Sequence, residues 1–169
     1  ADRAVHVETE AVLEPLAVAK LLKAVADREQ PQILLLGKQA IDDDANQTAQ
    51  MLAALLNAPQ GTFAGKIELS ENEAIVTREI DGGSETLALK LPAVISTDLR
   101  LNEPRYVKLP QIMQAKKKPL EKLTPEALNV NTAARVQAVR YAEPQTRRAG
   151  VKAADAADLA AKLKAAKVI

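Results

Sequence analysis

The order of apolar and polar positions predicts alternating strands and helices in the first sixty residues. A short apolar segment, residues 4–7, precedes a helix with Pro15 at its first position and apolar side chains at helical spacing up to Pro31. Residues 32–36 form a continuous apolar run, which is typical of a strand buried on both faces of a parallel sheet. A second helical pattern covers residues 51–56. This strand–helix–strand–helix order predicts an α/β domain.

From residue 60 onward the pattern changes to short segments separated by turns. Apolar positions in residues 67–69 and 74–80 predict two strands around a turn, and residues 81–83, Asp-Gly-Gly, are a strong signal for a second turn. Residues 86–91 alternate like a half-buried strand, and residues 93–97 read as another buried strand. We therefore expect an antiparallel segment attached to the parallel core.

The last seventy residues are less regular. Residues 98–125 form a long polar connection with one helical piece, residues 111–117, and such connections are usually functional or disordered. Residues 153–166 read as an Ala- and Lys-rich helix. We expect two domains: an α/β domain, residues 1–128, and a C-terminal arm and helix, residues 129–169, that pack on a partner subunit.

Composition narrows the chemistry that the chain can perform. The 169 residues contain no cysteine and one histidine, His6, which excludes thiol chemistry and argues against a zinc site or a Ser-His-Asp triad. The net charge of +1 gives no reason to expect a nucleic acid, and no apolar run approaches the roughly 20 residues that span a bilayer. We expect no metal, no nucleic acid and no direct insertion into a membrane.

The first candidate site is the loop between the second strand and the second helix. Such a loop lies where α/β sheets bind ligands, and a helix start attracts phosphate through its free N–H groups. With neither a Walker lysine motif nor a Gly-rich fingerprint, a mononucleotide is the expected ligand. A simpler alternative is that the aspartates cap the helix. The candidate residues are Gly37, Lys38, Gln39, Ala40, Ile41, Asp42, Asp43, Asp44, Ala45, Asn46, Gln47 and Thr48.

The second candidate site is a partner-docking segment, residues 98–118. It combines apolar side chains at helical spacing with a following basic run, and it contains Leu109, Pro110, Ile112, Met113, Lys116 and Lys117. Exposed apolar side chains supply binding energy, while nearby lysines steer a partner. In the alternative interpretation, the leucine and isoleucine belong to the core. RNA binding is a weaker option, because only Tyr106 could stack a base.

Three segments and the C-terminus resemble the beta subunits of electron-transfer flavoproteins. They are residues 38–48 (KQAIDDDANQT), residues 77–85 (TREIDGGSE), residues 98–118 (DLRLNEPRYVKLPQIMQAKKK) and residues 149–152. The resemblance implies a Rossmann-like nucleotide-binding fold of the adenine nucleotide alpha hydrolase-like type. It also implies a further stretch of chain before Ala1, which carries other AMP contacts and residues near the flavin.

In that family the beta subunit is an electron carrier component and not an enzyme. It pairs with an alpha subunit that holds most of an FAD, and it buries a structural AMP. Electrons arrive from acyl-CoA and related dehydrogenases and leave for a membrane quinone oxidoreductase. Because no signal peptide or bilayer-spanning run is visible, we expect the cytoplasm of a bacterium or the mitochondrial matrix of a eukaryote. The alternative is a stand-alone adenine-nucleotide-binding module or hydrolase of the same α/β fold.

The resemblance also gives roles to individual residues. It places AMP against residues 37–48, with Asp43, Asn46, Gln47 and Thr48 as the expected contacts. It makes Leu109 the anchor that enters a pocket of the dehydrogenase. It further implies that the carboxylate of Glu79 pairs with an arginine of the mobile flavin domain of the alpha subunit.

Overall fold

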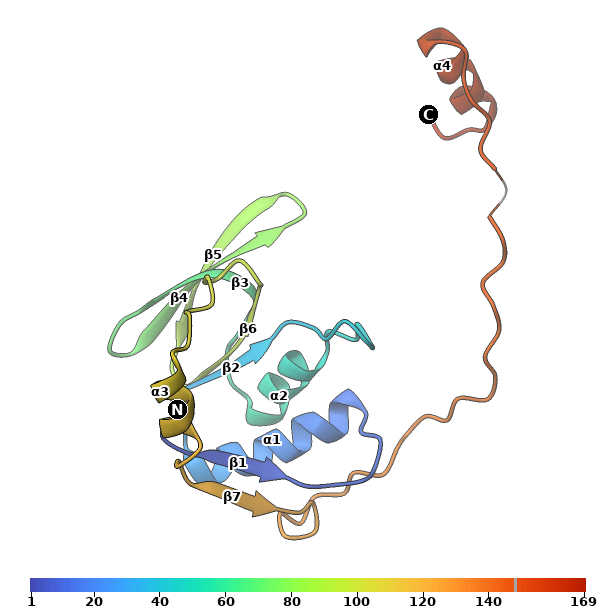
Figure 1. Cartoon of the computed structure of the whole chain (residues 1–169). Coiled ribbons are helices and arrows are strands. Elements are labelled where there is room, and N and C mark those ends of the chain that lie inside the picture. Colours follow the sequence, from blue (N-terminus) through green and yellow to red (C-terminus); the bar gives the residue numbers. More distant parts are fainter. Residues whose placement is uncertain (148) are drawn as a thin grey trace. The chain divides into compact units, whose positions relative to one another are not determined.

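The computed structural model describes residues 1–147 and 149–169, which form two compact units, Ala1–Arg135 and Val136–Ile169. The first unit contains β1 (Ala4–Val7), α1 (Pro15–Glu29), β2 (Ile33–Gly37), α2 (Thr48–Leu56), β3 (Gln60–Leu69), β4 (Glu73–Ile80), β5 (Gly83–Lys90), β6 (Ala93–Thr97), α3 (Leu109–Ala115) and β7 (Leu120–Leu123) (Figure 1). The second unit contains α4 (Ala156–Ala165).

Two sheets organise the first unit. β1 pairs with β7 in parallel. The larger sheet has the strand order β2-β6-β3-β4-β5, in which β2, β6 and β3 are parallel, while β4 and β5 continue it as antiparallel strands. The predicted α/β fold with an added antiparallel segment is confirmed.

The parallel part of the core is built around β6. Val94 on one face of β6 packs with Ala19 of α1 and with Leu52 of α2, so these two helices share one apolar cluster with the sheet. Ile95 on the opposite face belongs to a second cluster. β6 is therefore the strand buried on both faces, as its unbroken apolar run predicts.

For β2 the same prediction is wrong. Leu35 leaves 61% of its surface exposed, and every other residue of the strand is at most half-buried. β2 is the edge strand of the larger sheet, so only the face that carries Leu34 and Leu36 meets the helices. An apolar run cannot distinguish a central strand from an edge strand.

The second cluster forms where β3 bends toward the β4–β5 hairpin. The register of β3 shifts on both sides of Ala64, and Phe63 has a φ of 58°, so the strand turns sharply there. A Cβ atom on Gly61 would lie 3.0 Å from Leu89 and 3.1 Å from Val76. Any side chain at this position would have to displace Leu89 or Val76 by a few tenths of an ångström, so glycine lets the hairpin pack closely against β3.

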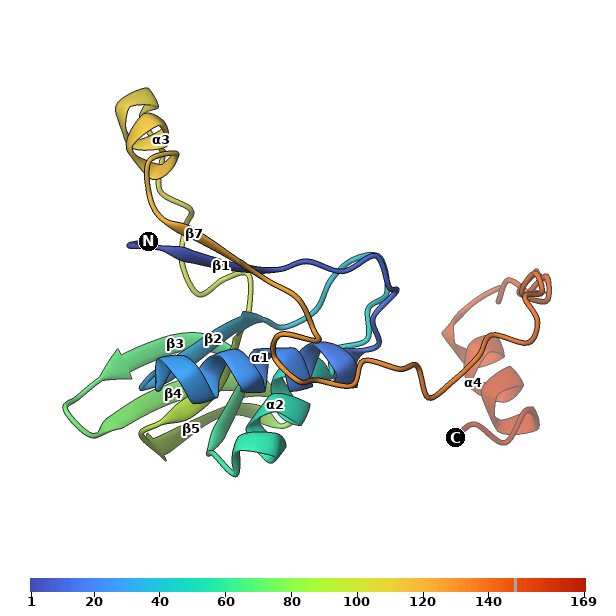
Figure 2. The same cartoon turned by 90° about the horizontal axis from the view of Figure 1, so that it is seen from below.

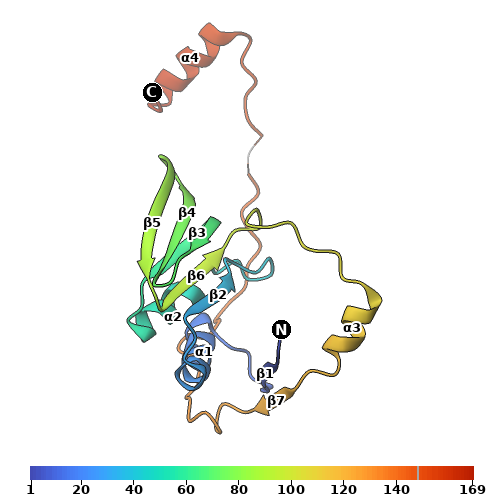
Figure 3. The same cartoon turned by 90° about the vertical axis from the view of Figure 1, so that its left-hand side faces the viewer.

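α3 lies at the tip of the excursion that connects β6 to β7 (Figures 2 and 3). It begins two residues earlier than the predicted helix over residues 111–117, and none of its residues is buried. The earlier start has a local cause: the N–H of Lys108 donates to Oε1 of Gln111 at 2.9 Å, and Pro110 suits a first helical turn.

In the second unit, α4 is capped by Asp155. Its carboxylate accepts a hydrogen bond of 2.8 Å from the N–H of Asp158, in the first turn of the helix. Across residues 1–147 and 149–169, no helix combines the length and the apolar character that a membrane span requires.

Candidate functional site

The loop between β2 and α2, residues 37–48, lies at the carboxyl end of β2, and we call it the nucleotide loop after the ligand expected from the sequence. Its backbone is tied to the neighbouring strand because the N–H of Lys38 donates to the carbonyl oxygen of Thr97 at 3.2 Å. Gln47 occupies the position before α2 and makes no side-chain cap. The first N–H groups of the helix therefore face the loop without a capping side chain, which is the arrangement that favours an anion.

The three aspartates stabilise the loop and do not cap the helix. The carboxylate of Asp42 accepts from the N–H of Asp43 at 3.0 Å, and that of Asp43 accepts from the N–H of Ala45 at 3.3 Å. Asp44 accepts from the amide of Gln39. Because none of these bonds reaches α2, the simpler capping interpretation is wrong.

A cavity of about 430 Å³ lies over this loop, between α1 and the start of α2. This volume falls in the range of small-molecule sites. The lining residues are Val18, Leu22, Leu36, Gly37, Lys38, Gln39, Ala40, Asp43, Ala45, Asn46, Gln47 and Thr48. The cavity thus gathers nine of the twelve loop residues singled out from the sequence and excludes Ile41, Asp42 and Asp44.

Three lining residues of the cavity were not anticipated: Leu36 of β2 and two residues of α1. Val18 and Leu22 come from α1, on the helix that packs beside α2. The helical pattern of this segment identified an apolar face, but no local pattern shows that part of this face borders a cavity. The crossover rule supplies no signal either, because β1 and β2, the strands that flank α1, lie in different sheets.

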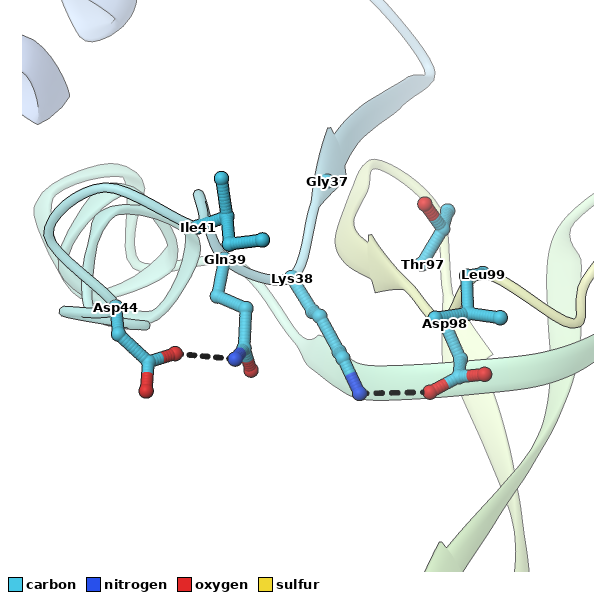
Figure 4. Close-up of a pocket in the computed structure, with 8 residues that line it drawn as sticks. All are labelled: Gly37, Lys38, Gln39, Ile41, Asp44, Thr97, Asp98 and Leu99. Atoms are coloured by element: carbon cyan, nitrogen blue, oxygen red, sulfur yellow. Dashed lines mark hydrogen bonds and ion pairs between the residues drawn. The ribbon is translucent and has the colours of Figure 1, made fainter.

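A second cavity of about 570 Å³ lies between the loop and the end of β6 (Figure 4). It is lined by Gly37, Lys38, Gln39, Ile41, Asp44, Thr97, Asp98 and Leu99. Nζ of Lys38 donates to Oδ2 of Asp98 at 2.9 Å across its floor. The Lys38 ammonium is therefore already engaged by a carboxylate, and its charge is balanced within the chain.

Among the carboxylates that line this cavity, Asp98 has the most strongly shifted pKa. It is 8% exposed and accepts hydrogen bonds from Lys38 and from both the N–H and Nε of Arg100, each Arg100 bond measuring 3.0 Å. The ammonium of Lys38, followed by the two Arg100 donors, holds the pKa of Asp98 far below its usual range. Asp98 therefore carries its negative charge at neutral pH.

Arg100, which contacts Asp98, also contacts Glu79 on β4. The guanidinium of Arg100 donates to both carboxylate oxygens of Glu79, at 3.1 Å and 2.7 Å. These bonds to Glu79, and then those to Asp98, raise the pKa of Arg100 further. Glu79, for which the family resemblance implies an arginine of the alpha subunit, pairs here with an arginine of its own chain.

The docking segment presents its apolar side chains to solvent. Leu109 is 69% exposed, and Ile112 and Met113 on the same helix are exposed as well. The alternative interpretation, in which Leu109 and Ile112 belong to the core, is wrong for this structure. Lys116 and Lys117 follow directly, so the exposed apolar side chains stand beside a basic helix end.

The comparisons with known proteins agree with this fold. The family model described as the electron transfer flavoprotein domain matches residues 1–128. The chain belongs to the electron transfer flavoprotein family. It is 60% identical over 152 residues to the "Electron transfer flavoprotein subunit beta" of Dictyostelium discoideum, covering 90% of this chain and 61% of the relative.

Two further relatives carry the same description. The protein of Bradyrhizobium diazoefficiens is 56% identical over 164 residues, and that of Homo sapiens is 52% identical over 168 residues. Each alignment covers 97% of this chain and 66% of the relative. The chain therefore resembles electron transfer flavoprotein beta subunits along nearly all of its length, and it spans somewhat less than two thirds of theirs.

Proposed function

We propose that this chain is the beta subunit part of a two-chain electron carrier. In this proposal an alpha subunit holds most of an FAD, and electrons enter from acyl-CoA and related dehydrogenases and leave for a membrane quinone oxidoreductase. The chain itself performs no catalysis: it holds an AMP and presents a docking surface. It would act in the bacterial cytoplasm or, in a eukaryote, in the mitochondrial matrix.

The residues around the smaller cavity fit an adenine mononucleotide. The uncapped N-terminus of α2 offers N–H groups to a phosphate, and the side chains of Asn46, Gln47 and Thr48 add donors. Val18 and Leu22 supply an apolar wall for a flat ring. AMP would supply no chemistry here; its role is to order the loop and the start of the helix.

The start of α2 also holds an unused acceptor. Nε2 of Gln50 donates to Oδ1 of Asn46 at 3.4 Å, while Oε1 of Gln50 is buried and has no hydrogen-bond partner within the part of the chain that the structure describes. A buried amide oxygen normally finds a donor. Gln50 lines neither cavity at the loop, so this acceptor is not counted among the AMP contacts.

The observation that carries the docking role is the exposure of Leu109 on α3, at the tip of a long excursion. Burying an exposed leucine side chain in a complementary pocket contributes about 1.5–3 kcal/mol of favourable free energy. The basic residues Lys116 and Lys117 would steer the approach of an acidic dehydrogenase surface.

Replacing Leu109 with alanine tests the proposal. In the complete two-chain complex, Leu109→Ala should lower kcat/KM for electron transfer from a dehydrogenase by at least about tenfold, with bound FAD and AMP unchanged. Leu69→Ala is the matched control, because Leu69 is 62% exposed at the end of β3. Equal transfer rates for both variants would remove Leu109 from the docking surface.

A further inference from the structure

Asp98 lies where the two candidate sites meet. It follows β6 directly and is the first residue of the docking segment, residues 98–118. Its N–H donates to the carbonyl oxygen of Ala64 on β3 at 3.0 Å, so the sheet fixes its backbone. Its side chain is buried, although the segment that it begins is exposed. Asp98 is therefore a rigid point from which the segment departs.

The two carboxylate oxygens of Asp98 serve different parts of the chain. Oδ2 accepts from Nζ of Lys38, at the root of the nucleotide loop. Oδ1 accepts from the N–H and from Nε of Arg100, at the root of the docking segment. One carboxylate thus contacts a side chain near the start of each candidate site.

Beyond Asp98, charges of alternating sign lead to the face of β4. Nη1 and Nη2 of Arg100 each donate one hydrogen bond to the carboxylate of Glu79. Hydrogen bonds therefore link four charged side chains in series: Lys38, Asp98, Arg100 and Glu79. A buried carboxylate without a cation costs free energy. If Lys38 or Arg100 is replaced, the remaining cation alone neutralises the charge of Asp98.

We propose that Asp98 is a positioning residue shared by the nucleotide site and the docking surface, which it holds through Lys38 and Arg100 respectively. This inference rests on the proposed function, since it assumes that the loop binds AMP and that the segment docks a dehydrogenase. It adds that the two surfaces depend on one residue that touches neither ligand.

Positioning and simple electrostatics predict opposite results for AMP. If Asp98 acted only through its charge, neutralising it would leave Lys38 more attractive to phosphate and AMP would bind more tightly. If Asp98 positions the loop, the same change lets the root of the loop move and AMP binds more weakly. The direction of the change therefore distinguishes the two roles.

The test uses the complete two-chain complex and Asp98→Asn, which keeps the shape of the side chain. We expect the Kd of AMP and the KM for reduced dehydrogenase each to rise about fivefold, the lower end of site-to-site coupling, with kcat unchanged. Lys38→Gln should affect AMP more than KM, and Arg100→Gln should do the reverse.

A matched control is available on the same sheet. Arg78 and Glu85 form an ion pair of 2.6 Å between β4 and β5, and Glu85 lines neither nucleotide-side cavity. Glu85→Gln removes the same charge as Asp98→Asn and should change neither Kd nor KM. Adding Arg100→Gln to Asp98→Asn should raise KM little further, because both act through one contact, whereas adding it to Glu85→Gln should give the full effect.

Several results would overturn the inference. They are tighter AMP binding by Asp98→Asn, an unchanged KM, or fully additive effects of Asp98→Asn and Arg100→Gln. If Asp98→Asn fails to fold, unchanged Kd and KM in Lys38→Gln and Arg100→Gln would overturn it instead. A wild-type complex that holds no AMP or accepts no electrons would refute the proposed function itself, and the inference with it.

Discussion

The ammonium of Lys38 lies 2.9 Å from Oδ2 of Asp98, although sixty positions of sequence separate the two residues. The contact joins the carboxyl ends of β2 and β6, two parallel neighbours in the sheet. It therefore connects the loop that leads into α2 with the segment that leads to α3. The local geometry of both candidate sites begins at this ion pair.

Asp98 should make the free energy of unfolding depend on pH in the acidic range. Lys38, then Arg100, lowers its pKa below the unfolded value of about 3.9, so its contribution is complete above that value and is lost as the pH falls below it. Asp98→Asn should lower the free energy of unfolding at pH 7, and its difference from wild type should shrink between about pH 5 and pH 3. Denaturant unfolding across this range measures the effect.

The control for this prediction is Asp81→Asn, since Asp81 is exposed in the turn between β4 and β5. This variant should follow the wild-type pH curve. A stability difference for Asp98→Asn that stays constant down to pH 3 would contradict the assignment, because it would show that the charge of Asp98 does not stabilise the fold.

Leu52 should be the most sensitive core position of α2. It is fully buried between α1 and β6, so Leu52→Ala leaves a cavity and should cost about 2–5 kcal/mol of unfolding free energy. Leu35→Ala, on the exposed face of β2, should cost well under half as much. Urea unfolding of the two variants measures both losses of unfolding free energy. Equal losses would contradict the exposure of the Leu35 face of β2.

Asn46 should contribute to nucleotide binding through both backbone and side chain. Its φ is 49°, which asparagine tolerates better than alanine, and its side chain lines the smaller cavity. Asn46→Gly keeps the backbone conformation and should weaken AMP about fivefold by removing the amide. Asn46→Ala should weaken it further because the conformation is also strained. Calorimetric titration of nucleotide-free protein measures both, and an unchanged Kd in both variants would exclude Asn46 from the site.

The lysines after α3 should govern the rate of docking. Replacing Lys116 and Lys117 with glutamine should slow dehydrogenase association about fivefold at low ionic strength, and the difference should fade above about 0.5 M salt. Lys20→Gln combined with Lys23→Gln on α1 removes the same charge elsewhere. Stopped-flow kinetics at several salt concentrations compare the two double variants, and equal slowing would indicate a general charge effect without a local steering surface.

Some parts of the fold were predictable because local pattern decides them. The turns at residues 70–72 and 81–83 and the burial of β6 follow from local pattern and turn chemistry. The start of α3 differs from the expected one because the side chain of Gln111 accepts from the N–H of Lys108, a contact that the apolar pattern does not contain. The exposure of Leu35 depends on strand order, which no local pattern contains.

The candidate sites were predictable only in part for a similar reason. The nucleotide loop is continuous in sequence, so strand end and helix start identify it together. The line from Lys38 through Asp98 and Arg100 to Glu79 joins three segments. Only the pairing of β2 with β6, of β6 with β3 and of β3 with β4 brings these segments into contact. Side chains that meet through strand order leave no spacing signal.

The most direct test of the central claim is the composition of the assembled protein. The complete chain should be co-purified with a flavin-bearing alpha subunit, and flavin absorbance and released nucleotide should be measured after denaturation. The account predicts one FAD and one AMP per pair of chains. A stable pair that contains FAD but no adenine nucleotide would contradict the role of the Gly37–Thr48 loop, and a complete chain that forms no pair would contradict the carrier function itself.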